Sequence, residues 1–373
     1  MGEIRTAVDA EDFLRGANFM SASGGGDPVK ERAQILSDLE DGLVPSWVDL
    51  NAFADDDLLV CCCYSGSIAP ESFDDPSERA RALGGGMVHE RPFIQAVEAM
   101  ERHTGQKAKG LISIEIGGIN TGAILTAACR MGRPLADADY AGRAIPELVS
   151  SSLRLFGADV LPFVLADRFG NEIVIVNSPS QEWVERIGKQ LALSSLGIIG
   201  CAFALLPASE VRRMAVPGTL SECLGLGRTI RQAREAGQDP VQAAVRALRG
   251  HLLFQGQVKG RDWANTGYME GTHTIAGTGA FAGHELKVWF RNENHVSWLD
   301  GRPYAASPDL IEFCDPASGE PLVNTYLALG QEIAVVGRRR RDLFDSPAGE
   351  DTLGPAHFGF PDFPYRGLET LTA

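Results

Sequence analysis

The first half of the chain alternates between segments with apolar residues at helical spacing and short apolar runs bounded by glycine, proline or polar residues. Apolar residues three and four positions apart predict amphipathic helices, and short apolar runs between turn signals predict buried strands. Strands that alternate with helices predict a parallel sheet with crossover helices. We expect helices over 10–20, 28–39, 92–103, 121–131 and 145–156, and strands over 57–64, 109–116, 134–138 and 159–166.

The second half begins with helical patterns and continues with strands and turns. Between 251 and 337, glycines separate apolar or alternating runs, which is typical of an antiparallel meander. The segment from 342 onward is expected to be loop-like. We expect further helices over 180–195, 220–236 and 240–249. The predicted fold is α/β, or α+β over the whole chain, with a mostly parallel N-terminal α/β domain at 1–166, a β-rich C-terminal domain at 167–361 and a tail at 362–373.

Charge and composition restrict the classes of partner. The chain has 373 residues and a formal net charge of −15. Nucleic-acid binding needs clustered basic side chains, so no such partner is expected.

The longest uncharged run, 191–208, contains serines and glycines and predicts a helix end followed by a buried strand rather than a membrane span. The start of the chain lacks the apolar segment of a secretory signal, and the seven cysteines form no disulfide framework. We expect a cytoplasmic homo-oligomer that binds a small molecule.

A first group of candidate site residues lies at the end of the apolar run 109–116. Glu115 stands inside this run, where a carboxylate is costly unless it is paired or coordinated. Gly117 and Gly118 let a backbone approach a ligand closely. Asn120 is suited to cap the following helix, whose N-terminus could hold an anion. Ligands of open α/β sheets bind at such strand ends, so a binding site is expected here.

A second group lies in the segment 133–147. Asp137 and Asp139 stand two residues apart, so in an extended segment their side chains share one side. Two close carboxylates share a proton, bind a cation or face water, and a solvated turn fits the pattern as well as a site does. Arg143 follows them, and Glu147 comes after a proline at an expected helix start, where the helix dipole favours a negative charge.

A third group follows the apolar strand that ends near residue 290. It contains Asn292, Glu293 and His295. A hairpin that turns near 282–283 would set His273 roughly opposite Glu293. Two histidines with a carboxylate suit zinc or another transition metal, although the chain has no strong local spacing of metal ligands. A single histidine in a sheet is more often structural than a ligand.

Eight short motifs, in their order along the chain, resemble those of the S-methyl thiohydantoin desulfurase family. The resemblance spans about residues 10 to 368, and 115–147 is its most specific part. Two positions depart from the family pattern: 21–23 reads Ser-Ala-Ser where Gly-Thr-Gly is expected, and His295 stands where an apolar residue is expected. The motifs lie at 24–28, 69–71, 115–120, 137–139, 142–147, 292–294, 307–311 and 354–359.

The resemblance implies an N-terminal and a C-terminal desulfurase domain and hydrolytic loss of sulfur from a thiohydantoin ring, which leaves a hydantoin. Family members are often found with hydantoinase- and oxoprolinase-type enzymes. Two alternatives remain at this stage. The chain could be a non-catalytic subunit or binding module that partners such an enzyme, or a cyclic amidohydrolase that acts on a ring without sulfur.

We assign provisional roles to the candidate residues. Asp137 and Asp139 are the expected ligands of a water or of a divalent metal, zinc or manganese, with His273 as a further metal ligand. Glu115 is the expected base or acceptor of a ring N–H, and Arg143 would hold a substrate carboxylate or the developing anion. The expected substrate contacts come from Gly117, Gly118, Asn120, Glu147, Asn292 and Glu293.

Overall fold

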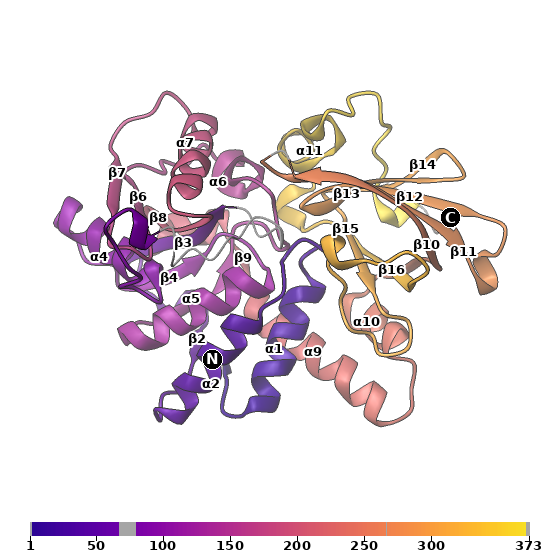
Figure 1. Cartoon of the computed structure of the whole chain (residues 1–373), viewed down its shortest axis with the longest axis horizontal. Helices are drawn as coiled ribbons and strands as arrows, with labels where there is room; N and C mark the ends of the chain where they lie inside the picture. Colours follow the sequence, from indigo (N-terminus) through magenta and orange to yellow (C-terminus); the bar gives the residue numbers. More distant parts are fainter. Residues whose placement is uncertain (1, 67–79, 266, 371–373) are drawn as a thin grey trace.

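The alternating apolar runs of the first half form a mixed sheet with helices on its faces (Figure 1). The computed structural model describes residues 2–66, 80–265 and 267–370, so the motif at 69–71 lies outside the described residues. Within these residues the first sheet has nine strands in the order β1-β2-β5-β4-β3-β8-β6-β7, with β9 paired to β5. Its strands are β1 (Gly2–Glu3), β2 (Ser46–Val48), β3 (Leu58–Gly66), β4 (Gly110–Ser113), β5 (Leu135–Asp139), β6 (Phe163–Ala166), β7 (Glu172–Ile175), β8 (Ile198–Pro207) and β9 (Val216–Pro217).

Four neighbouring strands of this sheet, β2, β5, β4 and β3, run parallel, so their carboxyl ends reach the same edge. Every residue of β4 is buried, as expected for a parallel strand covered on both faces. The α-helices with described bounds are α1 (Ala7–Phe19), α2 (Val29–Glu40), α4 (Pro92–Thr104), α5 (Gly118–Met131), α6 (Ser152–Leu155), α7 (Gln181–Ser194), α8 (Ala208–Met214), α9 (Thr219–Glu235), α10 (Pro240–Leu248) and α11 (Pro347–Leu353). No helix among the described residues has the length and apolarity to cross a bilayer.

Strands beyond residue 166 complete the first sheet. β8 pairs antiparallel with β3 and β6, β7 pairs with β6, and β9 pairs with β5. The first sheet therefore extends past the predicted boundary between 1–166 and 167–361. The division into domains stays a prediction, because strand pairing by itself does not define a folding unit.

The glycine-punctuated second half forms a seven-stranded antiparallel sheet within the described residues, which makes the second lobe in Figure 1. The strand order is β14-β13-β12-β11-β10-β16-β15. A mostly parallel α/β lobe followed by a β-rich lobe confirms the predicted fold class. The strands are β10 (His251–Asn265), β11 (Met269–Gly277), β12 (Glu285–Arg291), β13 (Glu293–Leu299), β14 (Arg302–Ala306), β15 (Leu310–Cys314) and β16 (Glu332–Arg338).

The predicted register of one hairpin in this sheet is wrong. His273 of β11 pairs with Val288 of β12, not with Glu293. The hairpin turns near 280–281, about two residues before the predicted turn, as the pairing of Ala276 with Glu285 shows. A second turn at Asn292, whose φ is 55°, then carries Glu293 into β13. His273 and Glu293 therefore do not form the predicted cross-strand pair.

Two helices from distant parts of the sequence cross closely where the lobes meet. A Cβ on Gly16 of α1 would lie 1.8 Å from the carbonyl oxygen of Cys223, and a Cβ on Gly227 of α9 would lie 1.8 Å from the carbonyl oxygen of Asp12. Only glycine permits this backbone approach. The crossing packs α1 directly against α9 in the middle of the molecule (Figure 1).

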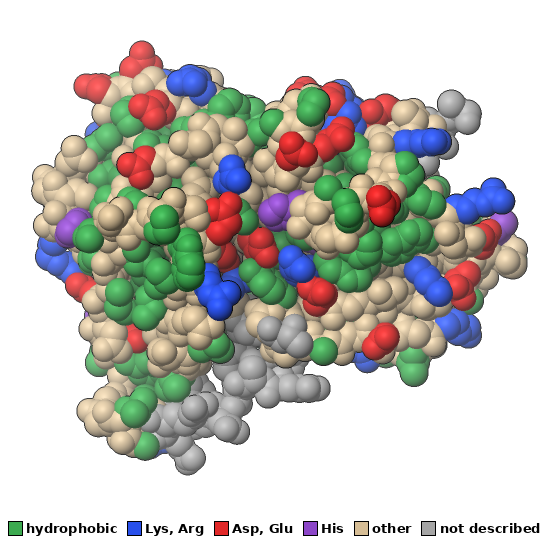
Figure 2. All heavy atoms as spheres, turned by 90° about the horizontal axis from the view of Figure 1, so that it is seen from above, with side chains coloured by type: hydrophobic (Ala, Val, Ile, Leu, Met, Phe, Trp, Pro, Cys, Tyr) green, Lys and Arg blue, Asp and Glu red, His purple; other side chains and the backbone are tan. Residues whose placement is uncertain are grey.

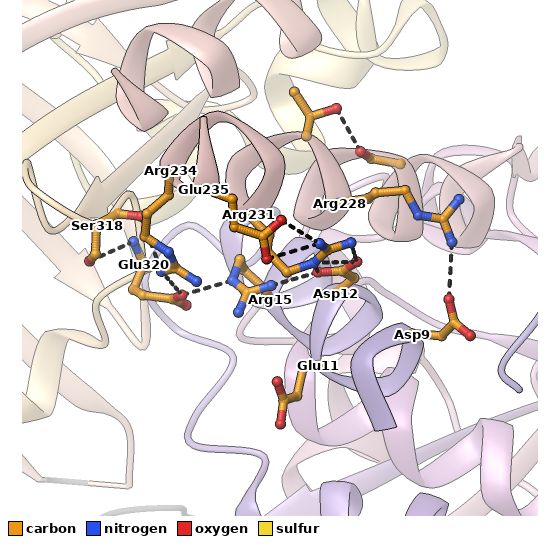
Figure 3. Close-up of polar contacts among 12 residues, drawn as sticks. Asp9, Glu11, Asp12, Arg15, Arg228, Arg231, Arg234, Glu235, Ser318 and Glu320 are labelled. Carbon is orange, nitrogen blue, oxygen red and sulfur yellow. Dashed lines mark hydrogen bonds and ion pairs between the residues drawn. The ribbon is translucent and has the colours of Figure 1, made fainter. Parts of the chain in front are cut away.

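Ion pairs surround this crossing (Figure 3). Asp12 is fully buried and accepts hydrogen bonds from Arg15 on its own helix and from Arg231 on α9. Glu320 of the second lobe pairs with Arg15 at 2.8 Å and with Arg234 at 2.6 Å. The network therefore connects α1, α9 and the second lobe.

Three details of the sequence-based prediction need correction. The helix predicted over 10–20 begins earlier, at Ala7, because Thr6 is the N-cap and Asp9 completes a capping box. The helix predicted over 145–156 is broken into a short 3-10 turn and α6, because Ser151 between them is extended. The segment from 342, predicted to be loop-like, contains α11.

Candidate functional site

A pocket lies where residues at the ends of β3 and β4 face the turn between β12 and β13. Both lobes and α7 contribute to its lining. Figure 2 shows acidic, basic and histidine side chains gathered where the two lobes meet. The polar residues of the lining include Tyr64, Ser65, Glu115, Asn120, Glu147, Glu185, Lys189, Asn292 and Glu293. Five of the predicted site residues with polar side chains are thus brought together: Glu115, Asn120, Glu147, Asn292 and Glu293.

Glu115 provides a buried carboxyl group just beyond the end of β4. Asn120 Nδ2 donates a hydrogen bond of 2.5 Å to its Oε1, and the backbone N–H of Ile145 donates one of 2.6 Å to its Oε2. Burial raises the pKa of this carboxyl to about 7 despite the two hydrogen bonds, and the negative charge of Asp139 adds to the rise. Glu115 can therefore exchange a proton near neutral pH.

Glu293 brings a second buried carboxyl group to the pocket, from the other lobe. Burial raises its pKa well above the usual range, and the negative charge of Glu115 raises it further. A Cβ on Gly24 would lie 2.3 Å from Glu293 Oε1, so the glycine loop and the carboxyl are closely packed. Both effects on the pKa favour the protonated form of Glu293, beside a carboxyl whose pKa is about 7.

Arg143 is buried outside the pocket lining. Its guanidinium donates to the carbonyl oxygens of Ala144, Asp309 and Asn294 at 3.1, 2.8 and 2.9 Å. Burial lowers its pKa to about 10, while the charge of Glu293 opposes that shift. Arg143 thus ties the two lobes together, and its donors are not free to hold a substrate anion in the way the sequence predicted.

The glycines at the start of α5 are also engaged within the protein. Gly117 is the N-cap, and its N–H donates to Thr121 Oγ1 at 3.0 Å. The N–H of Gly118 donates to Asn18 Oδ1 at 3.0 Å. Gly117 lines the pocket, whereas Gly118 is outside the lining. These two N–H groups are therefore not available to an anion.

Asn120 and Asn292, both predicted to contact the substrate, support neighbouring groups of the protein. Asn120 is not a helix cap; its Oδ1 accepts from the backbone N–H of Tyr64 at 2.7 Å while its Nδ2 donates to Glu115. Asn292 Oδ1 accepts from the backbone N–H of Met269 at 3.1 Å. Asn120 therefore orients the Glu115 carboxyl, and Asn292 holds the turn that presents Glu293.

Glu147 lies among several donors at the same pocket. Its carboxylate is 3.5 Å from Arg291 and 3.4 Å from His357. Although burial pushes its pKa upward, hydrogen bonds from His357 and Tyr268 and the nearby charge of Lys189 hold it below the usual value. Glu147 is therefore ionised at neutral pH and differs in this respect from Glu115.

Lys189 of α7 is the one basic side chain among the described residues of the lining. Its Nζ is 3.4 Å from Glu185 Oε1 and 3.4 Å from the carbonyl oxygen of Pro146. The ring centroid of Tyr268, from the other lobe, lies 3.1 Å from the same nitrogen. Burial lowers the pKa of this ammonium group, and the neighbouring carboxylates oppose the shift.

Asp137 and Asp139 lie outside the pocket lining. Asp137 accepts hydrogen bonds at the first turn of α9 from the backbone N–H groups of Leu220 and Ser221 at 2.9 and 3.0 Å. Asp139 accepts from the N–H groups of Ala141 and Gly142 at the turn after β5, and burial raises its pKa to about 6. Both carboxyls stabilise local backbone, so the predicted role as water or metal ligands has no geometric support.

Replacement of Asp137 by alanine is expected to lower the free energy of unfolding by about 1 kcal/mol, because two N–H groups of α9 lose their acceptor. Turnover should change little, since Asp137 does not line the pocket. Urea denaturation and a rate measurement test both expectations. The exposed Asp362→Ala variant is the control. A large loss of kcat with unchanged stability would contradict the assignment.

His273 does not join the other predicted metal ligands. Its ring stacks on Phe290 with centroids 4.7 Å apart, and burial lowers its pKa to about 4, so it is neutral. In the described parts of the chain, no group of three or more His, Cys, Asp or Glu residues could hold a metal ion. The set Asp137, Asp139 and His273 is therefore not gathered into one centre, and binding of zinc or manganese stays a prediction.

His295, one of the two departures from the family pattern, fills space in the second lobe. Its ring stacks on Phe358 with centroids 3.7 Å apart, and its Nδ1 is 3.2 Å from Ser307 Oγ. Burial lowers its pKa well below the usual value. A neutral aromatic ring thus replaces the expected apolar side chain.

Two family models match successive parts of the chain. The S-Me-THD-like N-terminal domain matches residues 8–177, and the S-Me-THD-like C-terminal domain matches residues 179–368. The chain belongs to the S-Me-THD-like family. This confirms the resemblance found in the motifs. Membership in a family named for a desulfurase suggests an enzyme, and it leaves the reaction of this member to be tested.

The fold of the S-Me-THD-like chain is shared with a solved protein. The X-ray crystal structure of a protein from Chromobacterium violaceum superposes with a TM-score of 0.77 and covers 99% of this chain and 100% of its own. The two sequences are 20% identical, so the likeness shows the fold alone. A search of curated proteins found no match.

Sequence reasoning missed part of the pocket of this family member. Glu185 and Lys189 stand four residues apart on α7, a spacing that places them on one helix face. Gly188 lies between them and is buried. Two charged residues beside a small residue on one helix face were the sequence signal that could have pointed to the pocket. Tyr268 is outside the lining but contacts Lys189, and it had no comparable signal, because it lies between β10 and β11, far from α7 in the sequence.

Proposed function

We propose that this S-Me-THD-like protein is a hydrolase that removes sulfur from a thiohydantoin-type ring and leaves a hydantoin. The observation that carries the proposal is the pair of buried carboxyls, Glu115 and Glu293, which line one pocket from opposite lobes. Burial raises the pKa of Glu115 to about 7 and raises the pKa of Glu293 well above the usual value of a glutamate. Two carboxyls with raised pKa values suit general acid–base catalysis near neutral pH.

For an S-methylated ring, a water molecule adds to the carbon that carries sulfur. The Glu293 carboxyl gives its proton to the ring nitrogen as the ring binds. The Glu115 carboxylate then takes a proton from this water, and the C=N double bond becomes single. In the second step the C–S bond breaks and Glu115 passes its proton to the departing sulfur. The new hydroxyl returns a proton to Glu293 as the ring C=O forms. The products are hydantoin and methanethiol, and both carboxyls regain their starting states.

No step of this scheme is assigned to a metal, because the described carboxyls and histidines do not gather three ligands at the pocket. Asn120 orients Glu115 in the scheme, and the carboxylates of Glu185 and Glu147 oppose the lowering of the Lys189 pKa by burial. Elemental analysis of the purified protein measures whether zinc or manganese is present.

Incubation with an S-methyl thiohydantoin is expected to release methanethiol and hydantoin in equal amounts. The rate should rise as the pH increases through about 7, because Glu115 must lose its proton to act as the base. Thiol titration and chromatography of the ring product measure the reaction between pH 5.5 and 8.5, a range that spans the pKa of Glu115. A rate that falls over this range would contradict the role given to Glu115.

The same assay separates the two alternatives. Ring opening of hydantoin without sulfur release identifies a cyclic amidohydrolase that uses the same pocket. Absence of turnover on every ring, together with co-purification of a hydantoinase- or oxoprolinase-type enzyme, identifies a non-catalytic subunit.

A further inference from the structure

The described pocket lining has more acidic than basic groups. Its charged side chains are four glutamates and one lysine: Glu115, Glu147, Glu185, Glu293 and Lys189. Lys189 already pairs with Glu185 at 3.4 Å and lies against the ring of Tyr268. A ligand that reaches Glu115 and Glu293 therefore meets carboxyl groups that this lysine does not neutralise.

Glu293 also has an unused acceptor. Its Oε2 is buried and makes no hydrogen bond within the described structure. Arg143 acts on Glu293 through its charge but donates its N–H groups to backbone carbonyls. A buried acceptor without a donor costs free energy, and a ligand N–H directed at Oε2 would remove that cost.

We propose that this pocket selects planar cyclic amidines in their protonated form, with the delocalised positive charge and two N–H donors facing Glu115 and Glu293. Amidinium groups resemble guanidinium groups, which pair with carboxylates through two parallel hydrogen bonds. The inference rests on the proposed function and names its substrate class: an S-methylated thiohydantoin ring contains such an amidine. The hydantoin product does not, so its affinity is lower and it leaves.

The charge preference must depend on pH. A bound cation favours the ionised form of each carboxyl, so binding releases protons from groups that hold them in the free protein. Glu115 has a pKa of about 7 when the pocket is empty. Affinity for a cation should therefore increase from pH 6 to pH 8, whereas affinity for a neutral ring should not.

A matched pair of small rings tests the inference by direct binding. 2-Aminoimidazoline is a cyclic guanidinium that stays protonated in the neutral range, and 2-imidazolidinone is the neutral cyclic urea of the same size. Calorimetry on the full chain at pH 8 is expected to show the cation binding at least about tenfold more tightly, with a smaller ratio at pH 6. Equal or tighter binding of the neutral ring at pH 8 would overturn the proposal.

Variants locate the preference in the pocket. Glu293→Gln keeps the shape of the protonated side chain and removes its ability to ionise, so the ratio is expected to fall at least about tenfold. Glu172→Gln, which removes an exposed carboxylate paired with Arg102, should keep the wild-type ratio. A ratio that survives in both Glu293→Gln and Glu115→Gln would overturn the proposal. If the protein releases sulfur but shows no preference for the cationic ring, only this inference is rejected. If it prefers the cationic ring but releases no sulfur, only the proposed reaction is rejected.

Discussion

Replacement of Glu115 by glutamine is expected to lower kcat for sulfur release by about 10²–10⁴-fold, the usual contribution of a general base. Glutamine has nearly the same shape but cannot accept the proton of the attacking water. The rise of the rate through pH 7 should disappear with it, because that rise reports the ionisation of Glu115. Steady-state rates of methanethiol release, measured across the pH range, test both effects.

The matched control for this variant is Glu172→Gln, in which an exposed carboxylate of β7 is changed in the same way. Its kcat and pH profile should equal those of the wild type. Because Glu115 is uncharged in part at neutral pH, the glutamine variant should also fold normally, which circular dichroism checks. A Glu115→Gln enzyme with unchanged kcat and an unchanged pH profile would remove Glu115 from the mechanism.

Replacement of Arg143 by methionine is expected to lower the free energy of unfolding by about 3–5 kcal/mol. The guanidinium is 2% exposed and donates to three backbone carbonyls, two of which, Asp309 and Asn294, belong to the second lobe. Methionine fills much of the volume but leaves these carbonyls without donors and removes the positive charge beside Glu293. Urea denaturation followed by fluorescence measures the loss.

Arg302→Met is the control for this experiment, because Arg302 is exposed on β14 and its change should leave the denaturation midpoint nearly unchanged. An Arg143→Met protein as stable as the control would contradict the structural role. In that case the sequence-based assignment of Arg143 to an anion would regain support.

Periodicity predicted the larger elements well. The helices α4, α7, α9 and α10 and the strands β3, β5 and β8 lie close to their predicted ranges, because each is long or bounded by proline, glycine or a capping serine. The short helix α6 was predicted as part of a longer helix. There the N–H of Ser152 bonds to the carbonyl oxygen of Tyr140 instead of to that of Leu148 in its own helix, and no local pattern reveals such a partner.

Position at strand ends predicted which residues line the pocket better than the expected register did. Glu115 and Asn120 follow β4 and line the pocket, as the rule for parallel sheets indicates. Asp137 and Asp139 belong to β5 of the same sheet, but α9 and the following turn use their oxygens. Leu220, whose N–H donates to Asp137, lies 83 residues later in the chain. Sequence spacing cannot show that the start of so distant a helix needs a hydrogen-bond acceptor.

The close crossing of α1 and α9 has a consequence for the order in which the protein can fold. Asp12 and Arg231 are separated by 219 residues, so α1 leaves the ribosome long before its glycine-lined partner has been made. Contacts between such distant segments form slowly. Until α9 arrives, the buried face of α1 and the fully buried carboxylate of Asp12 have no partner from that helix. The nascent first lobe is therefore a predicted client for chaperones during synthesis.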